Sequence, residues 1–311
     1  MQVVILSKPG WHADQLSAAL AARGHAGRVV PYESLIAHFG GGGRATLTSQ
    51  QTAILDADAV LARFIPAGSL EQIIYRVDAL HWIEEHGVVV MNTPRAIERS
   101  VDKFYTDARL REAAIATPET VVCEGAADAM ATIRAMLADR EDGSDAAVVI
   151  KPIFGSMGHG IVRVSDPDVA FRVLQPLDQI NSVFYVQRAV DSGGRDIRAF
   201  VVGSRLVGAI ERRPAEGDWR ANVSRGGSAR RVELPPAWEQ LAIRAAAAIG
   251  ADYAGVDLLP SSDGGAFVLE VNGIPGWQGL NDATAIDVAG AIVDHLIERV
   301  ASSRAATVLR A

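Results

Sequence analysis

The strongest chemical signal in the sequence is a pair of carboxylates on two short apolar segments. These segments are AGVDLLP at 254–260 and AFVLEVN at 266–272. Asp263-Gly264, between them, is a preferred centre for a β-hairpin turn. A hairpin symmetric about this centre places Asp257 opposite Glu270, and alternation along the strand puts Asn272 on the face of Glu270. Three oxygen-bearing side chains are therefore expected to converge.

Two such carboxylates need compensating charge. At about 4 Å they repel by about 4 kcal/mol at an effective dielectric constant near 20. The flanking apolar residues predict a substantially buried hairpin, which increases the repulsion. Mg²⁺ is commonly bound by a few carboxylates together with substrate phosphates. The residues alone leave two interpretations open, a magnesium site or a solvated hairpin face that carries unrelated acids.

A second candidate site begins at the end of an apolar segment. Lys151 ends the segment 148–151, and Gly155, Gly158 and Gly160 follow it. Glycines let the backbone aim N–H groups at phosphate oxygens, and a lysine supplies a point charge. The pattern indicates a phosphate-binding loop, with an ordinary hairpin as the alternative. His159 is expected to contact the loop or a substrate rather than to act as a general base.

A third candidate site is a group of arginines in an acidic chain. Its members are Arg198, Arg212, Arg213, Arg220 and Arg225, whereas the whole chain has 37 acidic and 30 basic residues and a net charge of −7. Local arginines in such a chain suggest a focused anion site for phosphoryl groups and carboxylates. A solvated basic loop is the alternative. If some of these arginines are expected to pair with substrate carboxylates, a separate alternative is that Arg212 and Arg213 alternate along a strand and one of them faces solvent.

The hydrophobic pattern predicts strands that alternate with helices over residues 1–95, which indicates a parallel α/β unit. The expected strands are 3–6, 29–30, 59–61 and 88–91, and the expected helices are 14–22 and 70–85. Ser7-Lys8-Pro9-Gly10 follows the first strand in place of the G-x-G-x-x-G turn of dinucleotide-binding folds, which disfavours a nicotinamide-dependent oxidoreductase. The Gly40–Gly43 run is expected to be a surface loop.

The pattern changes near residue 96. Expected helices are 102–112, 126–138 and 236–249, and expected strands are 148–151, 161–164, 184–187, 197–202 and 206–211. Gly203-Ser204 suits a tight hairpin between the last two strands. The tail from residue 302 is expected to be loosely held.

Composition excludes several classes of protein. A chain of 311 residues suggests about two domains, and 49% hydrophobic with 22% charged residues argues against disorder. The single cysteine, Cys123, excludes a disulfide framework and a zinc cluster built on cysteines. The acidic balance argues against nucleic-acid binding, and the lack of a long apolar segment argues against a membrane partner. We expect a cytoplasmic protein.

Taken together and in order, these segments resemble the ATP-grasp superfamily, specifically the RimK-like amino-acid ligases. The resemblance covers about residues 92–290. The matching pieces are RSVDK at 99–103, VIKP at 149–152, the loop to Gly160, GRDIR at 194–198, AIERR at 209–213, GDWRAN at 217–222, RGG at 225–227, AGVD at 254–257 and LEVNGIPG at 269–276.

The resemblance implies an α/β ATP-grasp fold with three parts. An N-terminal Rossmann-like domain would span residues 1–95, and a central lid subdomain would span 96–186. A C-terminal catalytic subdomain with an antiparallel sheet would span 187–311. ATP would lie between the central and C-terminal parts.

The resemblance also implies roles for individual residues. ATP would be bound by Lys103, Lys151, the loop residues Gly155, Ser156, Gly158 and Gly160, the adenine strand Gln187, Arg188, Ala189 and Val190, and Asp196 near the nucleoside. The phosphates and reaction centre would be served by Arg198, Arg220, Asn222 and Arg225. Mg²⁺ would be held by Asp257, Glu270 and Asn272, and Mn²⁺ is expected to substitute for it. Relatives often have an acidic residue and an aromatic one where this chain has Arg188 and Ala189, but adenine contact there is mainly through the backbone.

The implied reaction joins a carboxylate to an amine through an acyl phosphate, with ATP as the phosphoryl donor. Residues 275–280 are similar to relatives that attach glutamate to methanopterin-type coenzymes. The expected partners are therefore ATP, L-glutamate and a small carboxylate acceptor. The arginines can pair with substrate carboxylates.

Other interpretations stay open within this resemblance. The acceptor can instead be a protein or peptide C-terminus, or the chain can be similar to D-alanine–D-alanine ligases. A nucleotide-binding regulatory module without turnover is a further alternative. The sequence does not fix whether the protein is a homo-oligomer.

Overall fold

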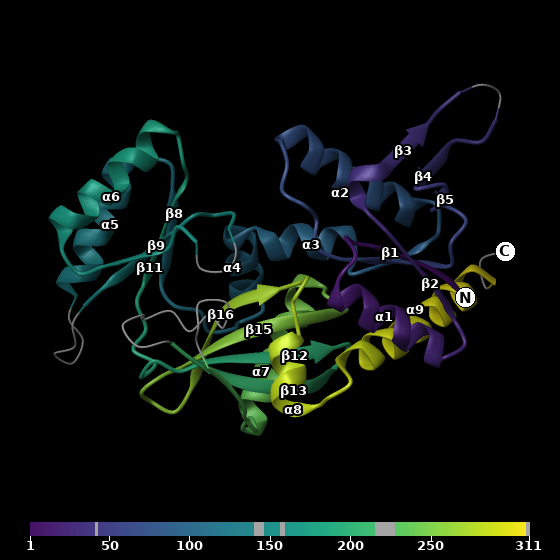
Figure 1. Ribbon diagram of the computed structural model, residues 1–311. Helices are drawn as coiled ribbons and strands as arrows, with labels where there is room; N and C mark the ends of the chain where they lie inside the picture. The colour runs from purple at the N-terminus through teal and green to yellow at the C-terminus, as the bar shows by residue number, and fades with distance from the viewer. Residues whose placement is uncertain (41–42, 140–145, 156–158, 215–227, 309–311) are drawn as a thin grey trace.

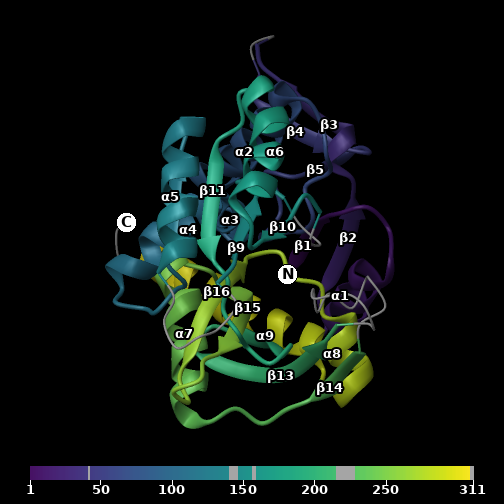
Figure 2. The same ribbon diagram turned by 90° about the vertical axis from the view of Figure 1, so that its left-hand side faces the viewer.

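The computed structural model describes residues 1–40, 43–139, 146–155, 159–214 and 228–308. Three sheet-bearing parts are visible in Figure 1, an N-terminal unit, a central sheet and a five-stranded sheet below them. A view turned by 90° shows the central sheet standing above the five-stranded sheet (Figure 2). The predicted α/β class, with a parallel N-terminal sheet and an antiparallel sheet toward the C-terminus, is confirmed by this arrangement.

The N-terminal unit contains a parallel sheet of order β2-β1-β6-β7. Its strands are β1 (Gln2–Leu6), β2 (Ala26–Val30), β6 (Ala59–Ala62) and β7 (Val89–Met91), and its helices include α1 (Trp11–Ala22) and α2 (Leu70–Glu85). Val3 and Ile5 pack in the cluster that holds α1, whereas Val4 and Leu6 pack in the cluster that holds α2. Both faces of β1 are therefore buried, which explains its uninterrupted apolar run.

A small antiparallel sheet in the same unit was not predicted. It has the order β3-β4-β5 and consists of β3 (Leu35–His38), β4 (Thr46–Ser49) and β5 (Thr52–Ala53), preceded by the 3₁₀ helix η1 (Tyr32–Ser34). The Gly40–Gly43 run lies between β3 and β4, and its residues 41–42 are outside the described part of the chain.

The central sheet is antiparallel and has the order β10-β9-β11-β8. Its strands are β8 (Thr120–Cys123), β9 (Val148–Lys151), β10 (Val162–Val164) and β11 (Phe184–Arg188). Helices α5 (Ala126–Ala138) and α6 (Pro167–Gln179) share one hydrophobic cluster with these strands. Two short helices, α3 (Pro94–Val101) and α4 (Lys103–Glu112), connect this part to the N-terminal unit.

The five-stranded sheet is antiparallel and has the order β14-β13-β12-β15-β16. Its strands are β12 (Asp196–Val202), β13 (Arg205–Arg213), β14 (Ser228–Arg231), β15 (Tyr253–Pro260) and β16 (Ala266–Asn272). Helix α7 (Pro236–Ile249) covers one face with Ala242, Ala245, Ala246 and Ile249, all 0% exposed. This spacing forms a single helix face, and the small alanines let the helix lie close to the strands.

The end of the chain returns to the N-terminal unit. After α8 (Gln278–Thr284), helix α9 (Val288–Val308) packs beside α1 (Figure 1). The expected loose tail from residue 302 was wrong, because α9 continues to Val308 and Arg304 forms an ion pair with Asp58. Among the described residues, no helix is long and apolar enough to cross a membrane. The domain boundaries at 95 and 186 stay predictions, and β11 extends across the second of them.

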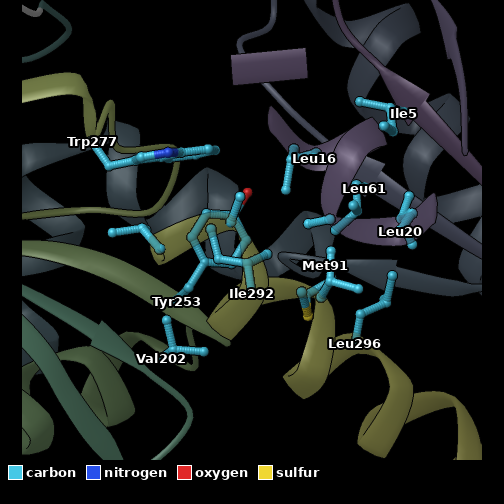
Figure 3. Packing of buried hydrophobic residues seen from close by; sticks show 14 of the residues in the cluster. Ile5, Leu16, Leu20, Leu61, Met91, Val202, Tyr253, Trp277, Ile292 and Leu296 are labelled. Carbon is cyan, nitrogen blue, oxygen red and sulfur yellow. The ribbon is translucent and has the colours of Figure 1, made fainter. Parts of the chain in front are cut away.

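One hydrophobic cluster joins the N-terminal unit to the five-stranded sheet. Figure 3 shows Trp277, Tyr253 and Val202 facing Leu61 and Met91 across this cluster. Trp277 is 2% exposed and Tyr253 is 0% exposed. The two parts are consequently held in a fixed relation by shared burial of apolar surface.

Asn92 stabilises the junction between the N-terminal unit and the five-stranded sheet through hydrogen bonds. Its side chain is fully buried and donates to the backbone oxygens of Tyr253 (2.8 Å) and Gly273, and its Oδ1 accepts from the backbone N–H groups of Asp252 (2.6 Å) and Tyr253 (3.1 Å). Buried backbone groups that lose such partners keep their desolvation cost.

Asn92→Ala should therefore destabilise the protein strongly. We expect the free energy of unfolding to fall by about 3–5 kcal/mol, because several buried backbone groups lose their partner at once. Denaturant titration followed by fluorescence measures the change. Asn281→Ala is the matched control, since the Asn281 side chain makes no hydrogen bond within the described residues, and it should shift stability by less than about 0.5 kcal/mol. Equal effects of the two substitutions would contradict this role.

Candidate functional site

The acidic hairpin forms with the predicted pairing. Strands β15 and β16 place Asp257 opposite Glu270, and Asn272 lies opposite Gly255. Next to the turn, Leu258 pairs with Val268 rather than with Leu269, so the predicted symmetry is wrong there by one residue. The register shift between Asp257 and Leu258 restores the predicted pairing from Asp257 onward. The predicted convergence of Asp257 and Glu270 is confirmed. Asp257 is 5% exposed, so bulk water cannot solvate its charge and the protein must compensate it.

A cleft of about 540 Å³ lies between the central sheet and the five-stranded sheet. The central-sheet side contributes Lys103, Lys151, Gly155, Gln187, Arg188, Ala189 and Val190. The five-stranded sheet contributes Asp196, Arg198, Asp257, Glu270 and Asn272. The structure thus brings most of the predicted site residues to one cavity, with lysines on one wall and carboxylates on the other.

Several predicted residues are placed elsewhere or are not described. Gly160 has φ +71° and lies against Pro152, outside the lining of the cleft. Ser156, Gly158, Arg220, Asn222 and Arg225 lie outside the described residues. Their roles stay predictions.

Two arginines neutralise Asp257. Arg198 donates from Nε to Oδ1 and from Nη2 to Oδ2, both at 2.7 Å, and Arg212 Nη2 lies 2.9 Å from Oδ2. Burial alone would raise the pKa of Asp257, but the two guanidinium groups outweigh it and hold this pKa at about 2. Arg212 also donates to both oxygens of Asp196 at 2.7 Å. Burial still raises the pKa of Asp196, against the effect of Arg212.

Arg212 and Arg213 are both paired with carboxylates of the protein itself. Arg212 is 4% exposed and is held by two carboxylates inside the cleft. Arg213 points away and lies 2.8 Å from the buried carboxylate of Glu211, which also contacts Arg195 and Arg230. The expected alternation along β13 is confirmed, because Arg212 is buried and Arg213 is exposed. Binding of a substrate anion by this group of arginines stays a prediction, since Arg220 and Arg225 lie outside the described residues.

A hydrogen-bonded chain of side chains holds Lys151. Its Nζ donates to Gln187 Oε1 at 2.6 Å, and Gln187 Nε2 donates to Thr120 Oγ1 (2.9 Å) and to the Tyr185 hydroxyl (3.1 Å). Tyr185 in turn donates to Asp107 Oδ2 at 2.5 Å. Burial lowers the pKa of Lys151 to about 8, and Lys103 adds to this effect while Glu270 opposes it.

The sequence analysis missed Thr120, Tyr185 and Asp107. Tyr185 and Gln187 are two residues apart on one strand and so share a face, which was an available signal. Strand β8 was not predicted, and Asp107 reaches the site only through the packing of α4. The second predicted lysine, Lys103, donates to the backbone oxygen of Gly155 at 3.0 Å, and burial lowers its pKa.

Residues 187–190, the predicted adenine strand, line the cleft, and their contact with adenine stays a prediction. The Arg188 side chain is tied to Glu119 (2.8 Å) and Asp139 (3.0 Å) and so does not project into the cleft as a free charge. The backbone N–H groups of Arg188 and Ala189 donate to Glu119 and Ala147. Within the described residues, the backbone N–H of Val190 has no protein acceptor.

The carboxylate wall has the chemistry of a magnesium site. Asp257, Glu270 and Asn272 offer only oxygen donors, which hard divalent cations prefer. No group of three or more His, Cys, Asp or Glu suited to a metal occurs in the described part of the chain. The predicted third donor, beside the two carboxylates, is the side-chain amide oxygen of Asn272. Asn272 Oδ1 accepts from the Ile274 N–H at 2.9 Å and keeps a lone pair. The donor set fits Mg²⁺.

Comparison with known proteins agrees with this geometry. Residues 100–296 match the RimK-like ATP-grasp domain. The chain is 36% identical over 268 residues to the tetrahydromethanopterin:alpha-L-glutamate ligase of Methanosarcina acetivorans, covering 78% of this chain and 80% of the relative. It is 32% identical to the probable alpha-L-glutamate ligase 2 of Hahella chejuensis, covering 96% of both.

Solved structures show the same fold. The ATP-grasp ligase PsnB, complexed with minimal precursor, has a TM-score of 0.73 at 23% identity and covers 96% of this chain and 98% of its own. The D-cycloserine synthetase DcsG has a TM-score of 0.70 at 20% identity, covering 96% and 99%. Fold and site therefore define an ATP-grasp ligase, an enzyme that forms carbon–nitrogen bonds with ATP. Within that class, the chain belongs to the RimK-like family.

The affinity for ATP should depend on the charge of Lys151. Only the protonated amine attracts phosphate, so affinity should be full below pH 8 and should fall as pH rises through the lowered pKa of about 8. We expect about tenfold weaker binding at pH 9 than at pH 7. Equilibrium dialysis or calorimetry at constant ionic strength measures it. Lys151→Arg, which stays charged, should give a flatter profile, and a flat wild-type profile up to pH 9 would refute the assignment.

Proposed function

We propose that this ligase adds L-glutamate to a carboxylate on a small coenzyme, through an acyl phosphate and with release of ADP. The observation that carries the proposal is the cleft itself, where Lys103 and Lys151 face Asp257, Glu270 and Asn272. Phosphate and divalent cation are recognised together by such opposed walls. The relatives named above are glutamate ligases, which supports the choice of amino acid.

The nucleotide would span the two walls. Lys151 and Lys103 would supply positive charge for phosphates, and the Val190 N–H and Asp196, which line the same cleft, would contact the nucleoside. Asp257, Glu270 and Asn272 would hold Mg²⁺, for which Mn²⁺ can substitute. A bound divalent cation supplies charge neutralisation between phosphate oxygens. Ser156, Gly158, Arg220, Asn222 and Arg225 are assigned to the phosphates and reaction centre by family resemblance.

The chemistry consists of two displacements. A carboxylate oxygen of the acceptor attacks the γ-phosphorus, the bond to the β-phosphate oxygen breaks, and ADP leaves. The amine nitrogen of glutamate then attacks the acyl carbon, the bond to the phosphate oxygen breaks, and phosphate leaves as the nitrogen loses a proton. Lys151 and Arg198 attract the charge that develops on transferring oxygens, and the protein acts mainly by positioning. No side-chain nucleophile is required.

The acceptor would enter from the side of the cleft nearest the N-terminal unit. His12 and Phe64 of that unit line the cleft together with Gly276, Gln278 and Gly279. Phe64 is 63% exposed and is available for an acceptor. The relative from Methanosarcina acetivorans is named for a coenzyme acceptor, and this supports a small coenzyme over a peptide.

A product assay tests the proposal. The enzyme is incubated with Mg²⁺-ATP and single amino acids, with either a pterin-type carboxylate or a peptide C-terminus as acceptor, and the products are weighed by mass spectrometry. We expect ADP, phosphate and a product that has gained glutamate. Stoichiometric AMP and pyrophosphate would reject the mechanism. A gain of alanine or lysine without glutamate would reject the amino acid, and turnover with the peptide alone would reject the coenzyme acceptor.

Glu270→Gln should leave the fold intact and remove most turnover. The amide keeps the size of the side chain but lacks the charge that a divalent cation needs, so we expect kcat to fall at least about 100-fold. Steady-state kinetics at saturating Mg²⁺ measures the loss, and the thermal midpoint reports folding. Glu233→Gln, at an exposed loop position, is the matched control. Near-native turnover of Glu270→Gln would show that Glu270 does not bind the cation.

A further inference from the structure

Arg198 occupies the oxygens of Asp257 that a divalent cation would use. Its Nε and Nη2 each donate at 2.7 Å to a different oxygen of that carboxylate, which is the bidentate geometry of a strong guanidinium–carboxylate pair. Arg212 takes a further position on Oδ2 at 2.9 Å. Each carboxylate oxygen has two lone pairs, so little acceptor capacity is left on Asp257.

The two arginines differ in their freedom to move. The Arg212 side chain is 5% exposed and is tied to Asp196 as well as Asp257. The Arg198 side chain is 22% exposed, lines the cleft, and has Asp257 as its carboxylate partner within the described residues. Arg212 is therefore a fixed partner, whereas Arg198 can leave if another anion enters the cleft.

We propose that Arg198 is an exchangeable counter-cation that keeps Asp257 closed to divalent cations until a nucleotide binds. The phosphates would then offer Arg198 a new anionic partner, and Asp257 would be freed for the cation that accompanies them. The proposal rests on the proposed nucleotide and cation site. It makes cation binding conditional on nucleotide, so free Mg²⁺ alone does not fill the site.

Mn²⁺ binding without turnover tests this exchange. Free Mn²⁺ is counted by its electron paramagnetic resonance signal, with and without the non-hydrolysable analogue AMPPNP. Wild-type protein should bind Mn²⁺ weakly alone and more tightly with AMPPNP. Arg198→Gln should raise the Mn²⁺ affinity in the absence of nucleotide by at least about tenfold, because a neighbouring positive charge is removed. A residue that only shaped the site or contacted substrate would not produce this gain.

Matched variants separate charge from shape. Arg198→Lys keeps the charge and should show no gain, whereas Arg198→Met removes it and should show the same gain as Arg198→Gln. Arg195→Gln removes a nearby arginine that pairs with Glu211 and should leave Mn²⁺ affinity unchanged. Asp257→Asn combined with Arg198→Gln should abolish the gain. Thermal midpoints establish that each variant folds. If Arg198→Gln does not fold, Arg198→Met takes its place in the comparison.

Two outcomes overturn the proposal in distinguishable ways. If uncharged variants bind Mn²⁺ no better than wild type without nucleotide, while wild type still binds Mn²⁺ with AMPPNP, then the exchange is wrong and the proposed function stands. If wild type binds no Mn²⁺ even with AMPPNP, the cation site itself is wrong and the exchange falls with it.

Discussion

Neutralisation of the buried Asp257 carboxylate is the constraint on which the rest of the site depends. A carboxylate that is 5% exposed needs positive partners at hydrogen-bonding distance. The sheet order supplies them, because β12 lies between β13 and β15. Arg198 is directly opposite Asp257 across one ladder, and Arg212 is directly opposite Asp196 across the other. Strand register thereby joins four charges from three strands into one network.

The two walls of the cleft carry opposite charge and belong to different sheets. Lys151 sits on the central sheet within a network that ends at Asp107, so its position is fixed while its burial makes protonation costly. Asp257 and Glu270 sit on the five-stranded sheet. The nucleotide and cation proposed for this cleft would contact both walls at once, whereas either sheet alone offers charge of only one of the two kinds needed. The fold thus makes recognition of phosphate depend on how the sheets are held together.

The sequence predicted those features of the fold and site that are set by residues close together in the chain. The Asp257–Glu270 pairing followed from a turn signal and strand alternation, and the parallel unit followed from apolar runs between helices. That pairing also depends on the bulge between Asp257 and Leu258, because the pairs next to the turn are offset by one residue, and the turn signal did not predict the bulge. The partners of Lys151 were missed for a similar reason, since Thr120, Tyr185 and Asp107 meet only when β8, β11 and α4 pack. The burial of Arg212 likewise depends on sheet order.

The side of the cleft nearest the N-terminal unit is built from interactions that differ in kind from the ion pairs around Asp257. Arg63 is 5% exposed and donates to the backbone oxygen of Pro275 at 2.9 Å. Its guanidinium carbon lies 4.7 Å from the centroid of the Trp277 ring. His12 Nε2 accepts from the backbone N–H of Trp277 at 3.2 Å, which requires a neutral imidazole ring on His12. Burial and the nearby Arg63 lower the pKa of His12 to about 4, so this acceptor stays available at neutral pH. The loop that follows Asn272 is consequently positioned by the N-terminal unit through Arg63 and His12, so a change in that unit would shift this loop while the Asp257 network, which lies on the five-stranded sheet, keeps its partners.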